Sequence, residues 1–199
     1  MHIDYYLAPQ SPWAYLGHAR FVALAQAHGA TVTVRPMDLG AKVFPVSGGL
    51  PLAQRAPQRQ AYRLVELKRF AEHLRLPLNL KPKFFPVAGD DAARLILGVQ
   101  QADGPAAALQ LTGAVLGAVW AQERNIADAG VLAELLAECG LPGERLQASR
   151  SAEVQAQYEA HTQAAIEAQV FGAPSYVIDG EIFWGQDRLD FVERRLARA

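Results

Sequence analysis

The sequence predicts an α/β fold in which the strands lie near the two ends of the chain and helices fill the middle. Two observations carry this prediction. Residues 1–36 show a strand–helix–strand pattern, and residues 170–199 show a strand–strand–helix pattern. Between them, residues 37–169 first lose any regular pattern and then place apolar residues at helical spacing. We therefore expect the two end segments to form one discontinuous domain, with residues 37–169 as a loop and helical insertion domain.

The chain begins with a strand that runs directly into a helix. Ile3, Tyr5 and Leu7 alternate with their neighbours, as is typical of a strand. Ser11 then occupies a position typical of a helix N-cap, and Pro12 the first helical position, where its missing N–H costs nothing. Because free N–H groups at a helix N-terminus stabilise an anion, Ser11 is a candidate catalytic residue. The alternative is that Ser11 only caps the helix.

The next residues complete a parallel crossover unit and then enter a loop. Residues 31–36 are β-branched and alternating and end at a proline, which predicts a second strand. Residues 37–57 contain repeated glycine and proline, which predicts a loop, and a loop of this length is often functional. Helices are expected at about 59–74, 90–102, 105–121, 127–138 and 151–168. On the first of these, Tyr62, Val65 and Leu67 are expected on the apolar face, and Arg63 and Glu66 elsewhere.

The C-terminal segment predicts a hairpin followed by a last helix. Residues 172–178 indicate a strand led in by Pro174, and Asp179–Gly180 is a two-residue hairpin signal before the partner strand 181–184. Residues 185–188 are expected to start the last helix. A carboxylate in the first turn, here Asp187, complements the helix dipole. Without the insertion, the order of elements is βαβ–ββα, which is the thioredoxin arrangement.

Composition excludes several classes of protein. The 199 residues are 51% hydrophobic and 20% charged, which is ordinary for a globular protein. The net charge of −1 argues against a nucleic-acid partner. The most apolar helix is too short to span a membrane and no signal-peptide pattern is present, so we expect a cytoplasmic protein without a membrane partner. With Cys139 as the one cysteine and five histidines without ligand spacing, we expect neither an intrachain disulfide nor a metal.

Three motifs carry a resemblance that covers essentially the whole chain. They are Ser-Pro-Trp-Ala-Tyr-Leu at 11–16, Gly-Ala-Pro-Ser-Tyr at 172–176 and Phe-Trp-Gly-Gln-Asp-Arg-Leu at 183–189. With these motifs the chain resembles the 2-hydroxychromene-2-carboxylate isomerases and, more distantly, the kappa-class glutathione transferases, both in the DsbA-like branch of the thioredoxin superfamily. The resemblance implies a glutathione-dependent cis–trans isomerase of aromatic catabolism, interconverting 2-hydroxychromene-2-carboxylate and trans-o-hydroxybenzylidenepyruvate-type compounds.

The resemblance also implies which residues bind glutathione. Ser11 would contact the glutathione sulfur. Ala173 would precede a cis-proline, Pro174, and its peptide groups would pair with the glutathione backbone. Gln186 and Asp187 would bind the γ-glutamyl group. The alternative for Pro174 is a trans-proline that starts an edge strand.

Basic and aromatic side chains are the candidates for substrate binding, because the implied partner is a small aromatic carboxylate. Guanidinium and ammonium groups suit a carboxylate, although such clusters are commonly a solvated surface. Aromatic rings suit the wall of an aromatic-substrate site, although core packing is their commoner use. The candidates are Lys42, Arg55 and Arg59 for charge, and Trp13, Phe84 and Phe85 for the wall. A homodimer is compatible with the sequence.

Three other functions stay open at this point. A kappa-like glutathione transferase would use the same thiolate and conjugate it to electrophiles. A DsbA-like thiol–disulfide protein is disfavoured because residues 11–14 lack the Cys-x-x-Cys motif. A non-catalytic binding protein would keep only the glutathione site.

Overall fold

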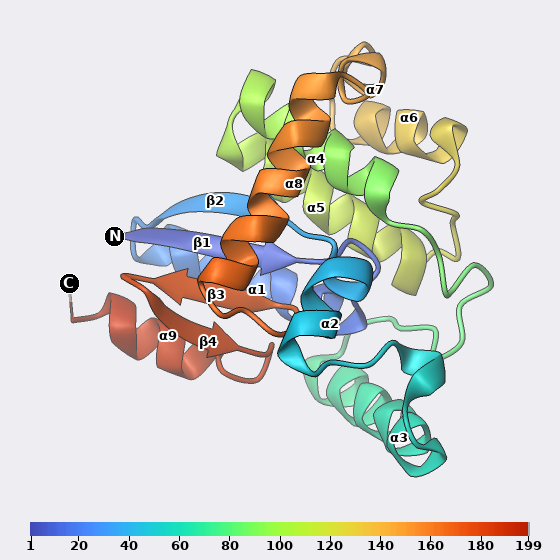
Figure 1. Cartoon of the computed structure of the whole chain (residues 1–199), viewed down its shortest axis with the longest axis vertical. Coiled ribbons are helices and arrows are strands. Elements are labelled where there is room, and N and C mark those ends of the chain that lie inside the picture. Colours follow the sequence, from blue (N-terminus) through green and yellow to red (C-terminus); the bar gives the residue numbers. More distant parts are fainter. Residues whose placement is uncertain (199) are drawn as a thin grey trace.

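The computed structural model describes residues 1–198 (Figure 1). Its strands are β1 (His2–Leu7), β2 (Thr31–Pro36), β3 (Ser175–Ile178) and β4 (Glu181–Trp184). Its helices are α1 (Pro12–Ala27), α2 (Phe44–Ser47), α3 (Pro57–Leu74), α4 (Asp90–Asp103), α5 (Pro105–Trp120), α6 (Ala129–Glu138), α7 (Arg145–Ala148), α8 (Ala152–Glu167) and α9 (Leu189–Leu196). The predicted loop contains α2 between a π-helical turn, η1 (Leu39–Val43), and a 3₁₀ turn, η2 (Leu52–Gln54).

One sheet contains strands from both ends of the chain, in the order β2-β1-β3-β4. β1 pairs in parallel with β2 and antiparallel with β3, where Tyr5 lies opposite Tyr176. β3 and β4 form a hairpin through Asp179 and Gly180, whose φ angles of 49° and 81° are those that a tight two-residue turn requires. The prediction of a thioredoxin-like fold with added helices is confirmed.

Helices cover both faces of the sheet (Figure 1). On one face, Ile3, Tyr5 and Tyr176 belong to a buried cluster that continues through α1, α4, α5, α6 and α9. On the other face, Tyr6 and Val177 pack against residues of α8 and η1. The larger core therefore runs without a break from the sheet into the helices of residues 37–169. The expected boundaries after residue 36 and before residue 170 separate segments with different orders of helices and strands. The side chains of these segments nevertheless pack into one core.

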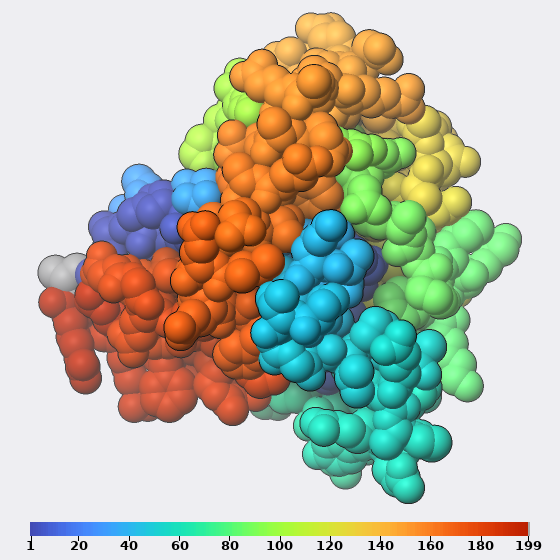
Figure 2. Space-filling view, viewed as in Figure 1, coloured from blue at the N-terminus to red at the C-terminus, as the bar shows by residue number. Residues whose placement is uncertain are grey.

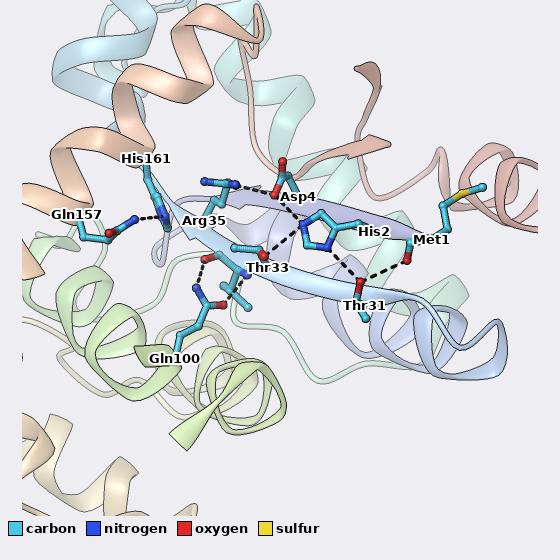
Figure 3. Close-up of polar contacts among 10 residues, drawn as sticks. Met1, His2, Asp4, Thr31, Thr33, Arg35, Gln100, Gln157 and His161 are labelled. Atoms are coloured by element: carbon cyan, nitrogen blue, oxygen red, sulfur yellow. Dashed lines mark hydrogen bonds and ion pairs between the residues drawn. The ribbon is translucent and has the colours of Figure 1, made fainter. Parts of the chain in front are cut away.

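A glutamine side chain pairs with peptide groups at the β2 edge of the sheet (Figure 3). Within the described sheet β2 is an edge strand, and such a strand presents unpaired peptide groups. The peptide N–H of Val34 donates to Oε1 of Gln100 at 2.7 Å, and Nε2 of Gln100 donates to the Val34 carbonyl at 3.0 Å. Gln100 thus imitates a neighbouring strand and fixes α4 against the sheet. Figure 3 also shows the Arg35–Asp4 ion pair, 2.6 Å long, that joins β2 to β1.

Helix α3 buries less apolar surface than predicted. Its buried residue is Leu67, whereas Tyr62 and Val65, expected with it on one apolar face, expose 54% and 44% of their surface. Figure 2 shows α3, in teal, standing out from the body of the molecule. Helix α3 packs against α1 on one side. Helical periodicity groups residues by face, but it does not show which face of α3 contacts the rest of the protein.

The described residues include neither a membrane-spanning helix nor a cluster of metal-binding side chains. Across residues 1–198, no helix combines the length and apolarity needed to cross a bilayer. Over the same residues, no group of three or more His, Cys, Asp or Glu side chains is arranged to hold a metal ion.

Two histidines are buried in their neutral form. Nε2 of His18, on α1, lies 3.0 Å from the Leu109 carbonyl of α5, and burial lowers the pKa of His18 to about 4. His161, on α8, lies 2.8 Å from Nε2 of Gln157, and burial, with a smaller effect of the Arg35 charge, lowers the pKa of His161 to about 4. Protonating either ring therefore opposes folding.

We expect His18→Gln to flatten the acid side of the stability profile. A histidine whose pKa is lowered on folding leaves stability intact above about pH 6.5 and reduces it as the pH falls from there towards 4. For His18 the full loss is about 3 kcal/mol, and glutamine removes it while keeping a donor near Leu109. Urea unfolding at pH 7 and pH 4.5 measures the difference. Equal pH dependence in the wild type and the variant would contradict a buried neutral His18.

Candidate active site

A cavity of about 590 Å³ opens between the N-terminus of α1, helix α3 and the turn that joins β4 to α9. This volume lies within the range of roughly 300–1,000 Å³ found for small-molecule sites. The cavity wall includes Trp13 from α1, Ala173 from the segment before β3, and Gln186 and Asp187 from the turn. Arg55 and Arg59 also line it, so the fold brings together six of the residues predicted for the site, although they are far apart in the sequence.

Ser11 caps α1 and touches the segment before β3. Its Oγ accepts a hydrogen bond from the Ala14 N–H at 3.2 Å and donates to the Ala173 carbonyl at 3.5 Å. The second contact joins residues 162 positions apart. Ser11 is 8% exposed and is not itself on the cavity wall, but its neighbours Trp13 and Ala173 are. The predicted helix start at Ser11–Pro12 is confirmed.

The segment around Pro174 is fixed to the turn after β4. The Ala173–Pro174 peptide bond is cis, as the sequence analysis favoured, and a second cis bond, Phe85–Pro86, was not predicted. The Ser175 hydroxyl donates to the Gly172 carbonyl at 2.8 Å, and the Gly185 N–H donates to the Pro174 carbonyl at 2.9 Å. The turn that carries Gln186 and Asp187 is thereby held beside Ala173.

Gln186 and Asp187 differ in their environment. Gln186 is 2% exposed, and both its backbone and side-chain oxygens accept from the Arg20 guanidinium, the backbone contact being 2.9 Å. Asp187 is exposed and forms a 2.5 Å ion pair with Arg188. The prediction that Asp187 lies in the first turn of the last helix is wrong. A turn closed by the Arg188 N–H and the Gly185 carbonyl intervenes, and α9 begins at Leu189.

Glycine at position 17 lets α1 approach this turn closely. A Cβ atom at Gly17 would lie 2.8 Å from Cβ of Gln186 and 3.1 Å from the Tyr176 hydroxyl, inside ordinary contact distance. The small residue therefore sets the distance between α1, which carries Ser11, and the turn, which carries Asp187.

Helix α3 forms a positively charged wall of the cavity. Six of its residues line the cavity: Gln58, Arg59, Tyr62, Arg63, Glu66 and Phe70. Among them, Arg59, Arg63, Glu66 and Phe70 follow one stripe at a spacing of three or four residues. Arg55, just before the helix, also lines it and donates to the Leu50 carbonyl at 2.8 Å. In the part of the chain that the structure describes, no ion pair joins Arg55, Arg59 or Arg63 to a carboxylate. These guanidinium groups are therefore available to an anionic ligand.

Aromatic rings line the same cavity. Trp13 and Phe70 meet edge to face with ring centroids 6.2 Å apart, and both are on the wall. Three predicted substrate-binding residues are not. Lys42 is exposed on η1, and the ring of Phe84 lies 5.1 Å from the Lys83 ammonium. Phe85 packs instead against Trp120, with ring centroids 4.8 Å apart.

Sequence reasoning missed Arg63 and Glu66, which it placed away from the packed face of α3. The signal was present, because positions 59, 63, 66 and 70 follow one helical stripe. Because that stripe mixes charged and aromatic residues, the search for an apolar helix face did not select it.

Comparison with known proteins shows the family to which this fold belongs. A family model described as a DsbA-like thioredoxin domain matches residues 2–197. The chain belongs to the DsbA-like thioredoxin family. The 2-hydroxychromene-2-carboxylate isomerase of Pseudomonas putida is 29% identical over 206 residues, which cover 100% of this chain and 95% of the relative. A solved structure of 2-hydroxychromene-2-carboxylate isomerase matches with a TM-score of 0.80 at 26% identity, over 100% of this chain and 95% of that one.

Another DsbA-like structure shows the shared fold alone. Cytosolic disulfide reductase DsbM from Pseudomonas aeruginosa with GSH matches at 18% identity with a TM-score of 0.70, over 99% of this chain and 100% of that one. In the present DsbA-like chain, residues 11–14 contain no cysteine, and Cys139 caps the end of α6 outside the cavity. Exchange between two cysteines of this chain is therefore excluded.

We expect Gly17→Ala to destabilise the protein by about 1–3 kcal/mol, because the added methyl meets the backbone and Cβ of Gln186. Gly117→Ala is the matched control, since a Cβ at Gly117 of α5 would meet nothing within 4 Å. Relieving a mid-helix glycine there should stabilise by up to about 1 kcal/mol. Urea unfolding measures both, and equal effects of the two substitutions would contradict a close approach at Gly17.

Proposed function

We propose that this chain is a glutathione-dependent cis–trans isomerase of aromatic carboxylates of the hydroxychromene type. One observation carries the proposal: the Ser11 hydroxyl, at the N-terminus of α1, touches Ala173 beside a cavity with Asp187 on one side and unpaired arginines on another. The full-length similarity to 2-hydroxychromene-2-carboxylate isomerases supports it.

The residues of the cavity fit the chemical groups of glutathione. The Asp187 carboxylate is exposed to the cavity and suits the α-ammonium of the γ-glutamyl group. Ala173 offers peptide groups to the extended cysteinyl segment, as in strand addition. Gln186 keeps Asp187 in place through its contacts with Arg20, and Arg59 suits the glycyl carboxylate.

The contribution of the protein is to stabilise charge and to orient the reactants. When bound, glutathione supplies a thiolate that adds reversibly to an electrophilic carbon and so permits rotation about a former double bond. The N-terminus of α1 favours negative charge on a nearby sulfur, and the Ser11 hydroxyl can donate to it. At 3.5 Å, the present contact of Ser11 with Ala173 is long for a hydroxyl donor, so a nearer acceptor would replace it. Trp13 and Phe70 would hold the aromatic ring in position.

The kappa-like transferase alternative uses the same site, and one assay separates the two reactions. Wild-type protein with glutathione should convert 2-hydroxychromene-2-carboxylate, followed by its ultraviolet spectrum, without consuming glutathione. A stable thioether product would indicate a transferase instead.

We also propose a cytoplasmic location, because the cytosol keeps glutathione reduced. A homodimer likewise remains a proposal.

We expect Ser11→Ala to lower isomerase turnover roughly 10–100-fold while changing glutathione affinity less than about threefold, because the lost hydrogen bond acts on the charged sulfur. Steady-state kinetics and calorimetry measure the two quantities. Ser151→Ala is the control, since Ser151 caps α8 through a bond of the same length, 3.2 Å, to the Val154 N–H. Either cap loss should cost about 1 kcal/mol of stability. Full activity in Ser11→Ala, or turnover by wild type without glutathione, would refute the mechanism.

We expect Asp187→Ala to weaken glutathione binding by about 1–3 kcal/mol, because a charge-assisted hydrogen bond to the ligand ammonium is lost. The matched control is Asp190→Ala, three residues further on, whose carboxylate pairs with Arg194 and is not on the cavity wall. Calorimetric titration with glutathione should separate the two variants. If both bind like the wild type, Asp187 is not part of the site.

A further inference from the structure

Two arginines one turn apart on α3 have different surroundings. Arg59 is exposed, whereas Arg63 is half-buried. The Arg63 guanidinium carbon lies 5.4 Å from the ring centroid of Phe85 and 5.6 Å from that of Trp120. Both side chains line the cavity, but only Arg63 has part of its charge taken out of water by aromatic rings.

A half-buried guanidinium without an acidic partner is unusual. The two ring faces offset part of the lost hydration but accept no hydrogen bonds from the N–H edge. Among residues 1–198, Arg63 forms no ion pair, and Glu66, one turn along the same stripe, is not within ion-pair distance of it. Burial, and to a lesser degree the nearby Arg55 charge, lower the pKa of Arg63 to about 10. The protein therefore holds a positive charge in a place that an anion would stabilise.

We propose that Arg63 is the specificity-determining residue of the substrate subsite and binds the single carboxylate of an aromatic acid. This inference rests on the proposed function and names the residue that selects its substrate. The aromatic ring of the ligand lies towards Phe70 and Trp13, at the other end of the stripe. Arg63 and Phe70 are seven residues apart, which is two helical turns on one face and roughly 10 Å along the axis. A planar acid of the size of a cinnamate or chromene carboxylate fits between them.

The other basic side chains suit this role less well. Arg55 already donates to the Leu50 carbonyl, and its guanidinium carbon lies 5.9 Å from the ring centroid of Phe44, so it belongs to the segment before α3. Arg59 is exposed, and water and salt weaken an ion pair there. A ligand carboxylate at Arg63 would pair with the same positive charge as at Arg59 but in less polar surroundings, where the attraction between opposite charges is stronger.

The test compares a charged ligand with its neutral analogue and needs no turnover. trans-Cinnamate and cinnamamide are titrated into the protein without glutathione, by calorimetry or by quenching of tryptophan fluorescence. Wild type should bind cinnamate about tenfold or more tightly than cinnamamide. Arg63→Met should reduce this preference to within about twofold by weakening cinnamate alone. Arg63→Gln, which keeps a polar planar group, should give the same result if methionine disturbs folding.

Two further variants serve as controls. Arg69→Met removes an exposed arginine of α3 that is not on the cavity wall, and it should keep the wild-type preference. Arg59→Met should weaken cinnamate less than about threefold. The inference is overturned if wild type does not prefer cinnamate, if Arg63→Met keeps the preference, or if Arg59→Met abolishes it.

The inference and the proposed function can fail separately. If wild type prefers cinnamate through Arg63 but shows no glutathione-dependent isomerisation, the proposed function is wrong and the carboxylate subsite stands. If isomerisation occurs and Arg63→Met leaves both the preference and the KM for 2-hydroxychromene-2-carboxylate unchanged, the function stands and Arg63 is not its selector.

Discussion

The antiparallel pairing of β1 with β3 is the constraint on which the candidate site depends. In this register Tyr6 lies opposite Ser175, so the last residues of β1 and the first residues of β3 lie side by side at the same end of the two central strands. The chain leaving β1 reaches Ser11 within a few residues, and the chain entering β3 has just passed Ala173. A shift of the register by one residue would turn every side chain of β1 to the opposite face and separate these two residues. The contact between them is therefore a consequence of strand pairing.

Aromatic packing then fixes α1 on the sheet. Tyr5, Phe21 and Tyr176 form a cluster whose ring centroids lie 4.5–5.3 Å apart. Such pairs contribute about 0.5–1.5 kcal/mol each beyond burial of area, and they resist sliding of the helix along the sheet. At Gly17 this packing leaves no room for a side chain, and Arg20 donates hydrogen bonds to Gln186. Together they hold the N-terminus of α1 and the Asp187 turn as one rigid unit.

Much of this unit could be predicted from the sequence, because its signals are local. The N-cap at Ser11, the Asp179–Gly180 hairpin and the strand–helix order each depend on a few adjacent residues, and all appear in the structure. The errors arose where tertiary packing decides. Asp187 precedes α9 because a turn at Gly185 delays the helix, and a dipole argument alone could not show this.

The wall formed by α3 was harder to predict for a related reason. Its stripe of Arg59, Arg63, Glu66 and Phe70 faces a cavity instead of a core. The rule that apolar residues face inward therefore selected Tyr62, which also lines the cavity, but not the charged members of the stripe. Lys42 and Phe84 were chosen for their charge and their aromatic ring, yet the fold places neither on the cavity wall. Such residues are located by the packing of the insertion against α1, which the sequence does not encode in any short segment.

The structure divides the proposed chemistry between two parts of the chain. The free N–H groups at the N-terminus of α1 favour negative charge next to Ser11. This effect of helix geometry does not depend on whether a sulfur there belongs to the protein or to a small molecule. In a chain whose only cysteine lies outside this cavity, that capacity suits an external thiol. Helix α3 contributes a separate set of positive charges on the cavity wall. Because the two sets sit on different elements, changes in α3 can alter the choice of substrate without disturbing the strand pairing that places Ser11 beside Ala173.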